Sequence, residues 1–370
     1  MTARGVSSRG RMGTGPGMSV VVITGASAGI GRACASMFAS HGYDVGLLAR
    51  GSDGLAGATA DVESFGSRAV AVQVDVSDSS ALEKAASAVE EELGPIDVWV
   101  NNAMATVYGP FLDISADEYR RVTEVTYLGF VNGTRAALHR MMPRDRGVIV
   151  QVGSALAYRG IPLQSAYCGA KHAIQGFTDS LRCELLHEES AVRLVEVQMP
   201  AVNTPQFLIQ RSKLRRQTQP VPPIYQPELA AEAVWHAAHH RRRQVWVGFP
   251  TVYTILGDRL AGPLLDAFLG RTGYDSQQLS SLRPPDAPDN LYDPVPGDHG
   301  AHGAFDSKAK SYSRQLNFSL SRPVARLAEA VDEGCAAAGR ALARLNQRKQ
   351  HRRSPAHDAS SETDRAPVPG

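Results

Sequence analysis

The chain has 370 residues, of which 43% are hydrophobic, and this length allows one large α/β domain with an appendage or two ordinary domains. Its 39 basic and 37 acidic residues give a formal net charge of +2, which excludes the strong overall charge typical of proteins that bind nucleic acids or acidic polymers. The four cysteines lie far apart without a CxxC pair, so a disulfide framework and a cysteine metal site are excluded and a reducing cytoplasm is favoured.

Residues 1–17 are rich in Gly, Ser and Arg and contain no apolar run of signal-peptide length. We expect a disordered leader, with Met18 as an alternative start of translation. A mitochondrial transit peptide is the other interpretation of this leader, but its glycines and Pro16 disfavour a helix. Because no uninterrupted apolar run reaches about 18 residues, we expect no membrane-spanning helix.

Residues 20–32 combine a β-branched run with a glycine-rich turn. The run at 20–23 is typical of a central parallel strand, and a helix follows the turn. Gly25, Gly29 and Gly31 give a tight turn and space for a pyrophosphate at the N-terminus of that helix, where free N–H groups and the helix dipole favour an anion. A glycine-rich turn without a ligand is the alternative, since such a motif alone is weakly specific.

Strand and helix patterns alternate from here to about residue 250. We expect further strands at 44–49, 69–74, 97–100, 147–152, 192–198 and 244–247, and helices at 31–40, 55–65, 79–93, 115–141 and 165–188. This alternation predicts right-handed crossovers between parallel strands. The sequence therefore predicts an α/β fold in which residues 18–250 form a doubly wound, parallel seven-stranded sheet with helices on both faces.

The end of the second strand indicates which nicotinamide cofactor would bind. An acidic residue there chelates the adenosine ribose, whereas an arginine accommodates a 2′-phosphate. The sequence has Arg50 at this point and no carboxylate, which favours NADP(H) over NAD(H). Arg32 would add to the positive field or face solvent, and Asp75 and Val76 after the third strand are candidates for the adenine edge.

Ser154, Tyr167 and Lys171 form the strongest catalytic pattern. Tyr167 and Lys171 are four residues apart on one expected helix and share a face. An ammonium beside a phenol lowers the pKa of the phenol, so Tyr167 is a candidate acid/base for a carbonyl or alcohol while hydride moves to or from a nicotinamide. Ser154 ends a strand, where open parallel sheets bind ligands, and would hydrogen-bond the same substrate oxygen. Without this serine, the tyrosine and lysine would indicate only a solvated helix face.

These motifs, in this order, resemble those of the short-chain dehydrogenases/reductases, single-domain NAD(P)-dependent enzymes with a Rossmann fold. Residues 24–31 resemble the family's TGxxxGIG cofactor motif, residues 101–104 its NNAG element, residues 167–171 its YxxxK motif and residues 200–204 its PGxxxT segment. The resemblance covers about residues 20–248. It implies that the serine positions the substrate, that the tyrosine is the acid/base, and that the lysine tunes the tyrosine and holds the nicotinamide ribose. Residues and resemblance together predict cofactor contacts at Gly25, Ser27, Gly29, Ile30, Gly31, Arg50, Asp75, Val76, Asn102, Ala103, Tyr167, Lys171, Pro200 and Thr204.

Three positions depart from the family pattern. Met104 replaces the last glycine of NNAG and would narrow the mouth of the active site, and Ala201 replaces the glycine after Pro200. Thr126 stands where the family often has an asparagine that holds a water for proton relay to the lysine. A hydroxyl also holds a water, although with fewer hydrogen-bonding groups than an amide, so we expect activity to survive with Thr126 in this catalytic position.

Substrate selection is expected in residues 203–227, where an apolar stretch at 207–209 precedes a basic run at 211–216. A lid with a solvated charged face is the main interpretation, and a cationic surface for a thioester of coenzyme A or of a carrier protein is the alternative. Tyr158, Gln164 and Met104 are further candidates for the substrate pocket. A steroid, a fatty acyl derivative, a polyketide and a xenobiotic ketone all remain open as substrates.

Residues 251–349 follow as a C-terminal extension, and residues 350–370 as a disordered tail. Residues 252–269 have apolar residues at helical spacing interrupted by Pro263, and we expect this segment to pack on the domain or on a partner subunit rather than on a membrane. Residues 274–312 are rich in Gly, Pro and Asp and predict a loop, with Asp298, His299 and His302 too few for a metal site. A second helix is expected at 321–348, and no metal is predicted.

The sequence thus predicts a cytoplasmic, NADP(H)-dependent oxidoreductase that acts on a carbonyl or secondary alcohol of a hydrophobic small molecule, with Tyr167 as acid/base. We expect a homo-oligomer that binds no nucleic acid. One alternative is a catalytically impaired nucleotide-binding scaffold or sensor, which Thr126 and the long extension favour. The other is a membrane-surface reductase acting on lipid, with peripheral membrane contact through residues 252–269.

Overall fold

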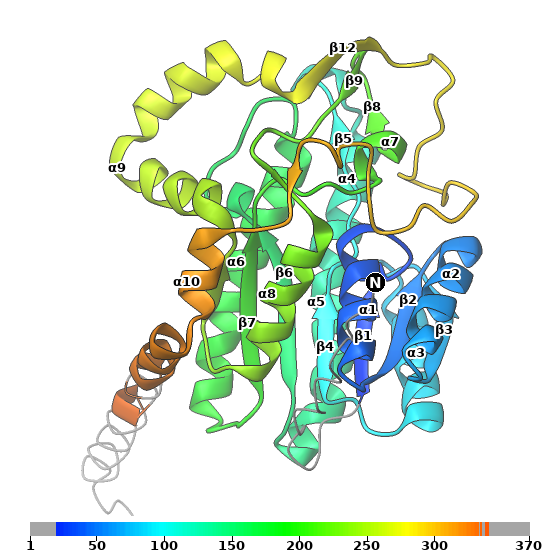
Figure 1. Cartoon of the computed structure of the whole chain (residues 1–370), viewed down its shortest axis with the longest axis vertical. Coiled ribbons are helices and arrows are strands. Elements are labelled where there is room, and N and C mark those ends of the chain that lie inside the picture. Colours follow the sequence, from blue (N-terminus) through cyan, green and yellow to red (C-terminus); the bar gives the residue numbers. More distant parts are fainter. Residues whose placement is uncertain (1–19, 333, 335–336, 340–370) are drawn as a thin grey trace, which may run out of the picture.

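The computed structural model describes residues 20–332, 334 and 337–339, and a seven-stranded parallel sheet lies at its centre (Figure 1). The strand order is β11-β7-β6-β4-β1-β2-β3, so the order reverses between β1 and β4. The predicted doubly wound sheet is confirmed, and its strands lie within two residues of the expected ranges. These strands are β1 (Val20–Thr24), β2 (Asp44–Ala49), β3 (Ala69–Gln73), β4 (Val98–Asn101), β6 (Val148–Ser154), β7 (Arg193–Met199) and β11 (Gln244–Trp246).

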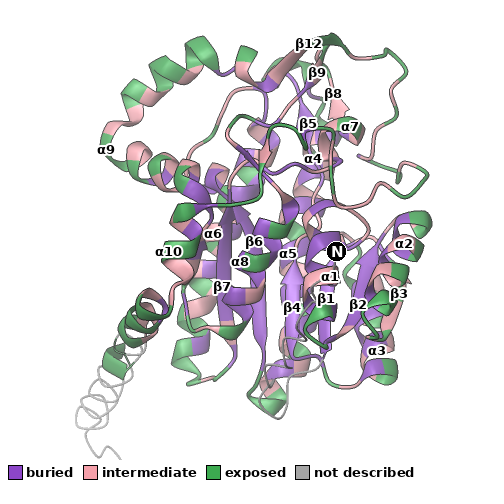
Figure 2. Cartoon of the chain, in the orientation of Figure 1, coloured by how far each residue is buried: buried purple, intermediate pink, exposed green. Residues whose placement is uncertain are grey.

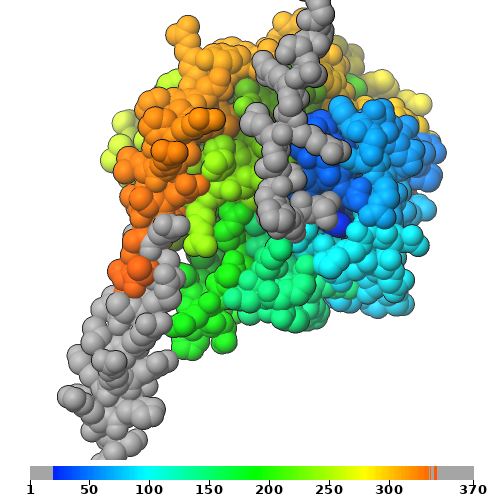
Figure 3. Space-filling model, turned by 60° about the horizontal axis from the view of Figure 1, so that its bottom comes forward, coloured from blue at the N-terminus to red at the C-terminus, as the bar shows by residue number. Residues whose placement is uncertain are grey.

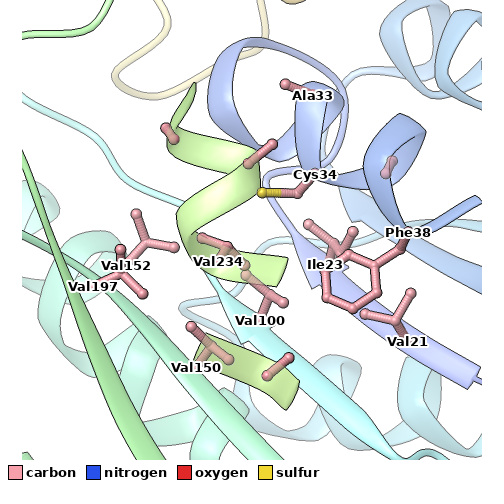
Figure 4. Packing of buried hydrophobic residues seen from close by; sticks show 14 of the residues in the cluster. Val21, Ile23, Ala33, Cys34, Phe38, Val100, Val150, Val152, Val197 and Val234 are labelled. Atoms are coloured by element: carbon pink, nitrogen blue, oxygen red, sulfur yellow. The ribbon is translucent and has the colours of Figure 1, made fainter. Parts of the chain in front are cut away.

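Helices cover both faces of the sheet, because successive strand residues point to opposite sides. Val21 and Ile23 belong to one buried cluster, and Val20 and Val22 belong to the other. The first cluster lies under α1 (Gly29–Ser40), α2 (Ser52–Ser64) and α8 (Pro227–His239), and Figure 4 shows α1 and α8 side chains against strand valines. The second cluster lies under α3 (Ser79–Leu93), α5 (Gly129–Met141) and α6 (Ser165–His187).

The helix expected at 115–141 is interrupted. It consists of α4 (Ala116–Thr123), a π-helical turn (Glu124–Leu128) and α5. Ser115 and Glu118 form a capping box, in which the Ser115 N–H donates to the Glu118 carboxylate at 2.9 Å and the Glu118 N–H donates to the Ser115 hydroxyl at 3.2 Å. The π-helical turn buries Thr126 against the loop that follows β4.

The extension begins with α9 (Gly248–Thr272), which is kinked at Ala261, two residues before Pro263. A proline disfavours helical backbone ahead of it, so the kink has a local cause. The loop expected at 274–312 is held by two short strand pairs. In these pairs β12 (Gln278–Leu282) is antiparallel to β9 (Arg216–Thr218), and β13 (Ala309–Lys310) is parallel to β10 (Ile224–Tyr225). In a third short pair, β5 (Val107–Tyr108) is parallel to β8 (Arg211–Ser212). The short helix α7 (Gln206–Ile209) comes just before β8.

The helix α10 (Arg314–Leu320) returns to the sheet domain. Leu316 is fully buried in the cluster under α8, and Arg242 donates a hydrogen bond to the Ser319 hydroxyl at 3.1 Å. Figure 3 shows this orange segment lying against the domain. Residues 322–332 are helical, as expected for the start of the second helix, whereas the leader at 1–17 and the tail at 350–370 lie outside the described residues.

The residues of the sheet and those of the outer part of the extension differ in how far they are buried (Figure 2). The central strands are buried, while the outer half of α9 is largely exposed. Over the part of the chain that the structure describes, no helix has the length and apolar character needed to cross a membrane. The expected division of the chain at residue 250 stays a prediction.

Candidate active site

A cavity of about 510 Å³ lies at the carboxyl edge of the sheet, beyond the ends of the neighbouring strands β1 and β4. Side chains and backbone from the expected cofactor and catalytic residues line it together. This position is the topological switch point, at which doubly wound sheets bind ligands. The predicted site residues on its wall are Gly25, Ser27, Gly29, Ile30, Arg50, Asp75, Val76, Asn102, Ala103, Met104, Ser154, Gln164, Tyr167, Lys171, Pro200 and Thr204.

The glycine-rich turn has the backbone that a phosphate site requires. Gly25 has a φ of +67°, a conformation that L side chains rarely adopt. A Cβ at Gly31 would lie 2.1 Å from the Gly25 carbonyl oxygen, so only glycine fits at the start of α1. The turn is fixed to β2, because the Gly25 N–H donates to the Leu48 carbonyl at 2.7 Å. The turn and the first amides of α1 therefore fit the diphosphate of a dinucleotide.

Asn102 joins this turn to β4. Its side-chain amide donates to the carbonyls of Thr24 at 3.1 Å and Gly25 at 3.3 Å. The Thr24 hydroxyl in turn accepts the N–H groups of Asn102 at 2.9 Å and Ala103 at 3.1 Å. Asn102 is thus a structural clamp on the glycine turn as well as part of the cavity wall.

Ser154, Tyr167 and Lys171 meet at the same cavity from two elements. Ser154 ends β6, and the other two residues lie in the first two turns of α6. The Lys171 ammonium nitrogen lies 5.6 Å from the centroid of the Tyr167 ring and donates to the Val152 carbonyl at 2.8 Å. The predicted grouping of these residues with the glycine turn therefore has the geometry of one reaction centre.

Burial shifts the pKa values of Tyr167 and Lys171, the two candidate catalytic side chains on α6. Burial raises the pKa of Tyr167, and its hydrogen bond with Ser154 opposes this rise. Burial also lowers the pKa of Lys171 to about 7. The expected lowering of the Tyr167 pKa beside the lysine differs from the direction in this structure, where burial raises that pKa. The phenol therefore carries its proton at neutral pH.

Comparison with known proteins agrees with this geometry. Residues 19–213 match the family model of the short chain dehydrogenases. The uncharacterized oxidoreductase YxnA of Bacillus subtilis (strain 168) is 33% identical to this chain over 76% of this chain and 79% of its own length. The chain belongs to the short-chain dehydrogenase family. It is an oxidoreductase of the NAD(P)-binding Rossmann type.

Other relatives of this short-chain dehydrogenase match over a smaller share of this chain. Dehydrogenase/reductase SDR family member 7B of Bos taurus is 36% identical over 48% of this chain, which spans 56% of the bovine protein. A solved alcohol dehydrogenase of Thermococcus sibiricus, complexed with 5-hydroxy-NADP, is 27% identical over 62% of this chain and 96% of that chain, with a TM-score of 0.55. A solved short chain dehydrogenase of Mycobacterium paratuberculosis, bound to NAD, is 25% identical over the same shares, with a TM-score of 0.55.

The residues expected at the adenosine end of the dehydrogenase already have protein partners. Arg50 donates to the carbonyl oxygens of Asn290 and Tyr292, at 2.5 and 2.7 Å. The Asp75 carboxylate pairs with Arg121 and accepts the Ser77 hydroxyl at 2.7 Å. Both residues line the cavity. Their hydrogen bonds with these protein partners fix the orientation of the two side chains at the site.

Three predicted site residues, Gly31, Thr126 and Tyr158, are absent from the described residues that line the cavity. Gly31 follows the lining residues Gly29 and Ile30 at the start of α1. The Thr126 hydroxyl donates to the Ala105 carbonyl at 2.7 Å and accepts the Ala105 N–H at 3.0 Å, so it holds the loop after β4. The Tyr158 hydroxyl accepts the Gln244 side-chain N–H at 2.7 Å and is turned toward β11. A relay role for Thr126 stays a prediction, and a substrate contact of Tyr158 loses its geometric basis.

The basic run at 211–216 is partly neutralised within the protein. Arg211 pairs with Glu118 at 3.1 Å and with Asp289 at 2.8 Å, and Lys213 pairs with Glu118 at 2.7 Å. Within the described part of the chain, no member of this run lies on the cavity wall. The alternative of a cationic surface for an anionic thioester therefore has no support from the cavity.

Part of the cavity wall comes from the C-terminal extension, which sequence reasoning did not connect with the site. One group is apolar and lies on α9, and the other belongs to the segment after β12. The residues concerned are Tyr253, Thr254, Leu265, Phe268 and Leu269 of α9, and Asn290, Pro294, Val295, Gly297 and His299 of the later segment. In the sequence, the helical spacing of residues 252–269 predicts a helix that could carry the α9 residues. No local pattern indicates that the residues after β12 reach the site.

Proposed function

We propose that this short-chain dehydrogenase transfers a hydride between NADP(H) and a carbonyl or secondary alcohol of a hydrophobic small molecule, with Tyr167 as general acid/base. The observation that supports this most directly is the meeting of Ser154, Tyr167 and Lys171 with the glycine turn in one cavity. The nicotinamide, when bound, supplies or accepts the hydride. The side chains of the protein bind and orient the reactants and donate or accept the proton.

In the reducing direction, the Tyr167 phenol donates its proton to the substrate oxygen as the hydride arrives at the carbonyl carbon. The Ser154 hydroxyl hydrogen-bonds the same oxygen and holds it next to the phenol. The ammonium form of Lys171 stabilises the phenolate that remains, because its nitrogen lies 5.6 Å from the ring centroid. Burial raises the pKa of Tyr167, so the protonated phenol is the form that is available to donate this proton.

The proposed substrate is hydrophobic because the outer part of the cavity is apolar. Phe207, Leu265 and Phe268 belong to this wall, and Tyr108 and Met104 line the same cavity. Apolar walls with few polar groups bind apolar ligands and leave the polar groups to orient them. A ketone or aldehyde on an apolar carbon skeleton fits this cavity, because its skeleton packs on the apolar wall and its carbonyl oxygen hydrogen-bonds the polar groups.

The NADP(H) preference rests on Arg50 at the end of β2, where no carboxylate is available for a ribose diol. One similar solved protein is complexed with 5-hydroxy-NADP and another is bound to NAD, so the family accommodates both dinucleotides. Titration of the purified protein with NADPH and NADH, followed by tryptophan fluorescence, tests the preference. Tighter NADPH supports it, and tighter NADH refutes it. A screen of apolar ketones and aldehydes with the preferred dinucleotide then tests turnover, and binding without any turnover would favour the nucleotide-binding scaffold.

A peripheral membrane location is a second candidate, favoured by the outer face of α9. Phe249, Leu256, Leu260 and Leu264 of α9 are exposed and do not line the cavity. A cytoplasmic homo-oligomer that covers the same face with a second copy is our first proposal, and the described cysteines, Cys34, Cys168 and Cys183, are unpaired as a reducing compartment requires. Sedimentation velocity and liposome flotation distinguish the two: self-association without flotation supports the oligomer, and flotation of a monomer supports the membrane location.

A further inference from the structure

Residues 289–306, which we call the strap, run back from the β12 end of the extension to the start of α1. Figure 1 shows this yellow-orange segment passing above α1 before it reaches β13 and α10. It has almost no regular secondary structure, yet Leu291 is fully buried in the cluster under α3 and α5. The strap is therefore packed into the domain at its start.

The first polar attachment joins the strap to the end of β2. Arg50 donates hydrogen bonds to three successive strap carbonyls, those of Asn290 at 2.5 Å, Leu291 at 3.4 Å and Tyr292 at 2.7 Å. Arg121 donates to the Leu291 carbonyl as well, at 3.1 Å. Backbone carbonyls of the extension thus bind the side chain that would meet the adenosine ribose.

The second attachment joins the strap to the glycine turn. Asp298 pairs with Arg32 at 3.0 Å, and the Gly300 carbonyl accepts the N–H of Gly29 at 3.0 Å. Gly29 is the first residue of α1, so the strap uses one of the three leading amides that have no acceptor inside the helix. The amides of Ile30 and Gly31 are left for an anion. The Gly297 N–H also donates to Asp53 at 2.7 Å.

Between these attachments the strap faces the cavity. Pro294, Val295, Gly297 and His299 line it opposite the glycine turn and the ends of β2 and β3. The strap therefore forms one wall of the part of the cavity that fits the adenosine and diphosphate.

We propose that the strap is the outer wall of the dinucleotide site and that the dinucleotide enters and leaves only when the strap detaches from Arg32 and Arg50. This inference rests on the proposed function, since it assigns a dinucleotide to the cavity. It makes the C-terminal extension part of the cofactor site. Dinucleotide exchange is then limited by strap opening rather than by diffusion.

A matched pair of variants tests the strap at Arg32. Asp298→Asn removes a carboxylate that attaches the strap, whereas Asp61→Asn removes a carboxylate of α2 from the same guanidinium. The two side chains are similarly exposed, 41% for Asp298 and 45% for Asp61, so the change in charge is equivalent. We expect NADPH release, measured by stopped-flow displacement, to be about ten-fold faster in Asp298→Asn and unchanged in Asp61→Asn. Equal effects, or no effect of either substitution, would overturn the proposal.

A reversible crosslink tests the same proposal in the opposite direction. A Cβ built at Gly51 lies 3.4 Å from the Cβ of Pro294, close to the roughly 3.5–4.5 Å spacing of a disulfide. In the double variant Gly51→Cys with Pro294→Cys, oxidation should slow both binding and release of NADPH at least ten-fold, and dithiothreitol should restore the reduced rates. Unchanged exchange in the oxidised protein would overturn the strap proposal.

The wild-type titration separates this proposal from the one on which it rests. A wild-type protein that binds neither NADPH nor NADH would overturn both the proposed function and the strap. A wild-type protein that binds NADPH, with release that neither Asp298→Asn nor the crosslink changes, would overturn the strap alone.

Discussion

The Arg50 guanidinium donates a hydrogen bond to the carbonyl oxygen of Tyr292, 2.7 Å away, although 242 residues separate the two in sequence. Arg50 directly follows β2, and Tyr292 belongs to the strap. The residue that would distinguish NADP(H) from NAD(H) is thus held by the C-terminal extension. A substitution of Arg50 is expected to weaken both the binding of the 2′-phosphate and the attachment of the strap. Only NADPH carries the 2′-phosphate, so comparing NADPH with NADH separates the two effects.

Arg50→Gln should weaken NADPH binding more than NADH binding. Loss of a charge-assisted hydrogen bond to a phosphate raises the dissociation constant about ten-fold or more, whereas the strap effect applies to both dinucleotides. Isothermal titration of both dinucleotides measures the difference. Arg68→Gln is the control, because it removes an exposed arginine that pairs with Asp44 away from the cavity. Equal weakening of NADPH and NADH would show that Arg50 acts only through the strap.

Burial of Lys171 should make the stability of the protein depend on pH. Its pKa in the folded protein is about 7, below the value of about 10.5 in an unfolded chain, so the unfolded state binds more protons between these values. The free energy of unfolding should therefore rise with pH across this window, by up to about 1.4 kcal/mol per pH unit. Burial raises the Tyr167 pKa and acts in the opposite direction only above about pH 10.

Lys171→Met should remove this dependence on pH. Urea unfolding of the wild type and the variant at several pH values between 7 and 9 measures the difference in the free energy of unfolding. We expect the wild type to gain stability relative to Lys171→Met as the pH rises. A constant difference over this range would mean that Lys171 keeps its proton in the folded protein.

Thr126→Val should destabilise the protein, because it leaves the buried N–H and carbonyl of Ala105 without their side-chain partner. The expected loss is about 1–3 kcal/mol of unfolding free energy. Thr126→Ser keeps the hydroxyl and should retain most of the stability. Chemical denaturation measures both variants, and a valine variant as stable as the serine variant would remove the structural role assigned here to the hydroxyl.

Arg159→Lys should raise the KM for an apolar ketone several-fold with little change in kcat. Arg159 binds Asp258 at 3.1 Å and also Asp266, so one guanidinium joins the two parts of α9 across its kink. A lysine keeps the charge but lacks the fork that reaches both carboxylates. Because α9 forms part of the apolar cavity wall, its loosening affects substrate binding first.

The control for Arg159→Lys is Arg271→Lys, which changes an exposed arginine on the same helix. Steady-state kinetics on both variants with one ketone provides the comparison. A fall in kcat at unchanged KM in Arg159→Lys would contradict a role in holding the wall, since Arg159 would then act on the chemical step.

The sheet could be predicted from sequence because its signal is local. The β-branched strands, the glycine turn and the spacing of Tyr167 and Lys171 each lie within a few consecutive residues, and their order along the chain determines the parallel topology. Ser154 could be assigned to the site because strand ends of an open parallel sheet share one edge.

The strap could not be predicted, since its hydrogen bonds with Arg50 and Arg32 join residues 240 and 266 positions apart. Residues 274–312 carry turn-forming residues without periodicity, which indicates a loop but not its position. The same limit applies to the basic run, because its partners Glu118 and Asp289 are remote in sequence. The tyrosine pKa depends on burial, which the spacing of Tyr167 and Lys171 does not reveal.

The most direct test compares a tyrosine that lines the cavity with a tyrosine that does not, in single-turnover reduction of an apolar ketone by bound NADPH. Tyr167→Phe removes the proposed acid, and Tyr158→Phe removes a hydroxyl that is turned toward Gln244. We predict that Tyr167→Phe keeps NADPH binding and loses about 100-fold or more in rate, while Tyr158→Phe remains close to the wild type. A Tyr167→Phe variant that reduces the ketone at the wild-type rate would contradict the assignment of Tyr167 as the proton donor.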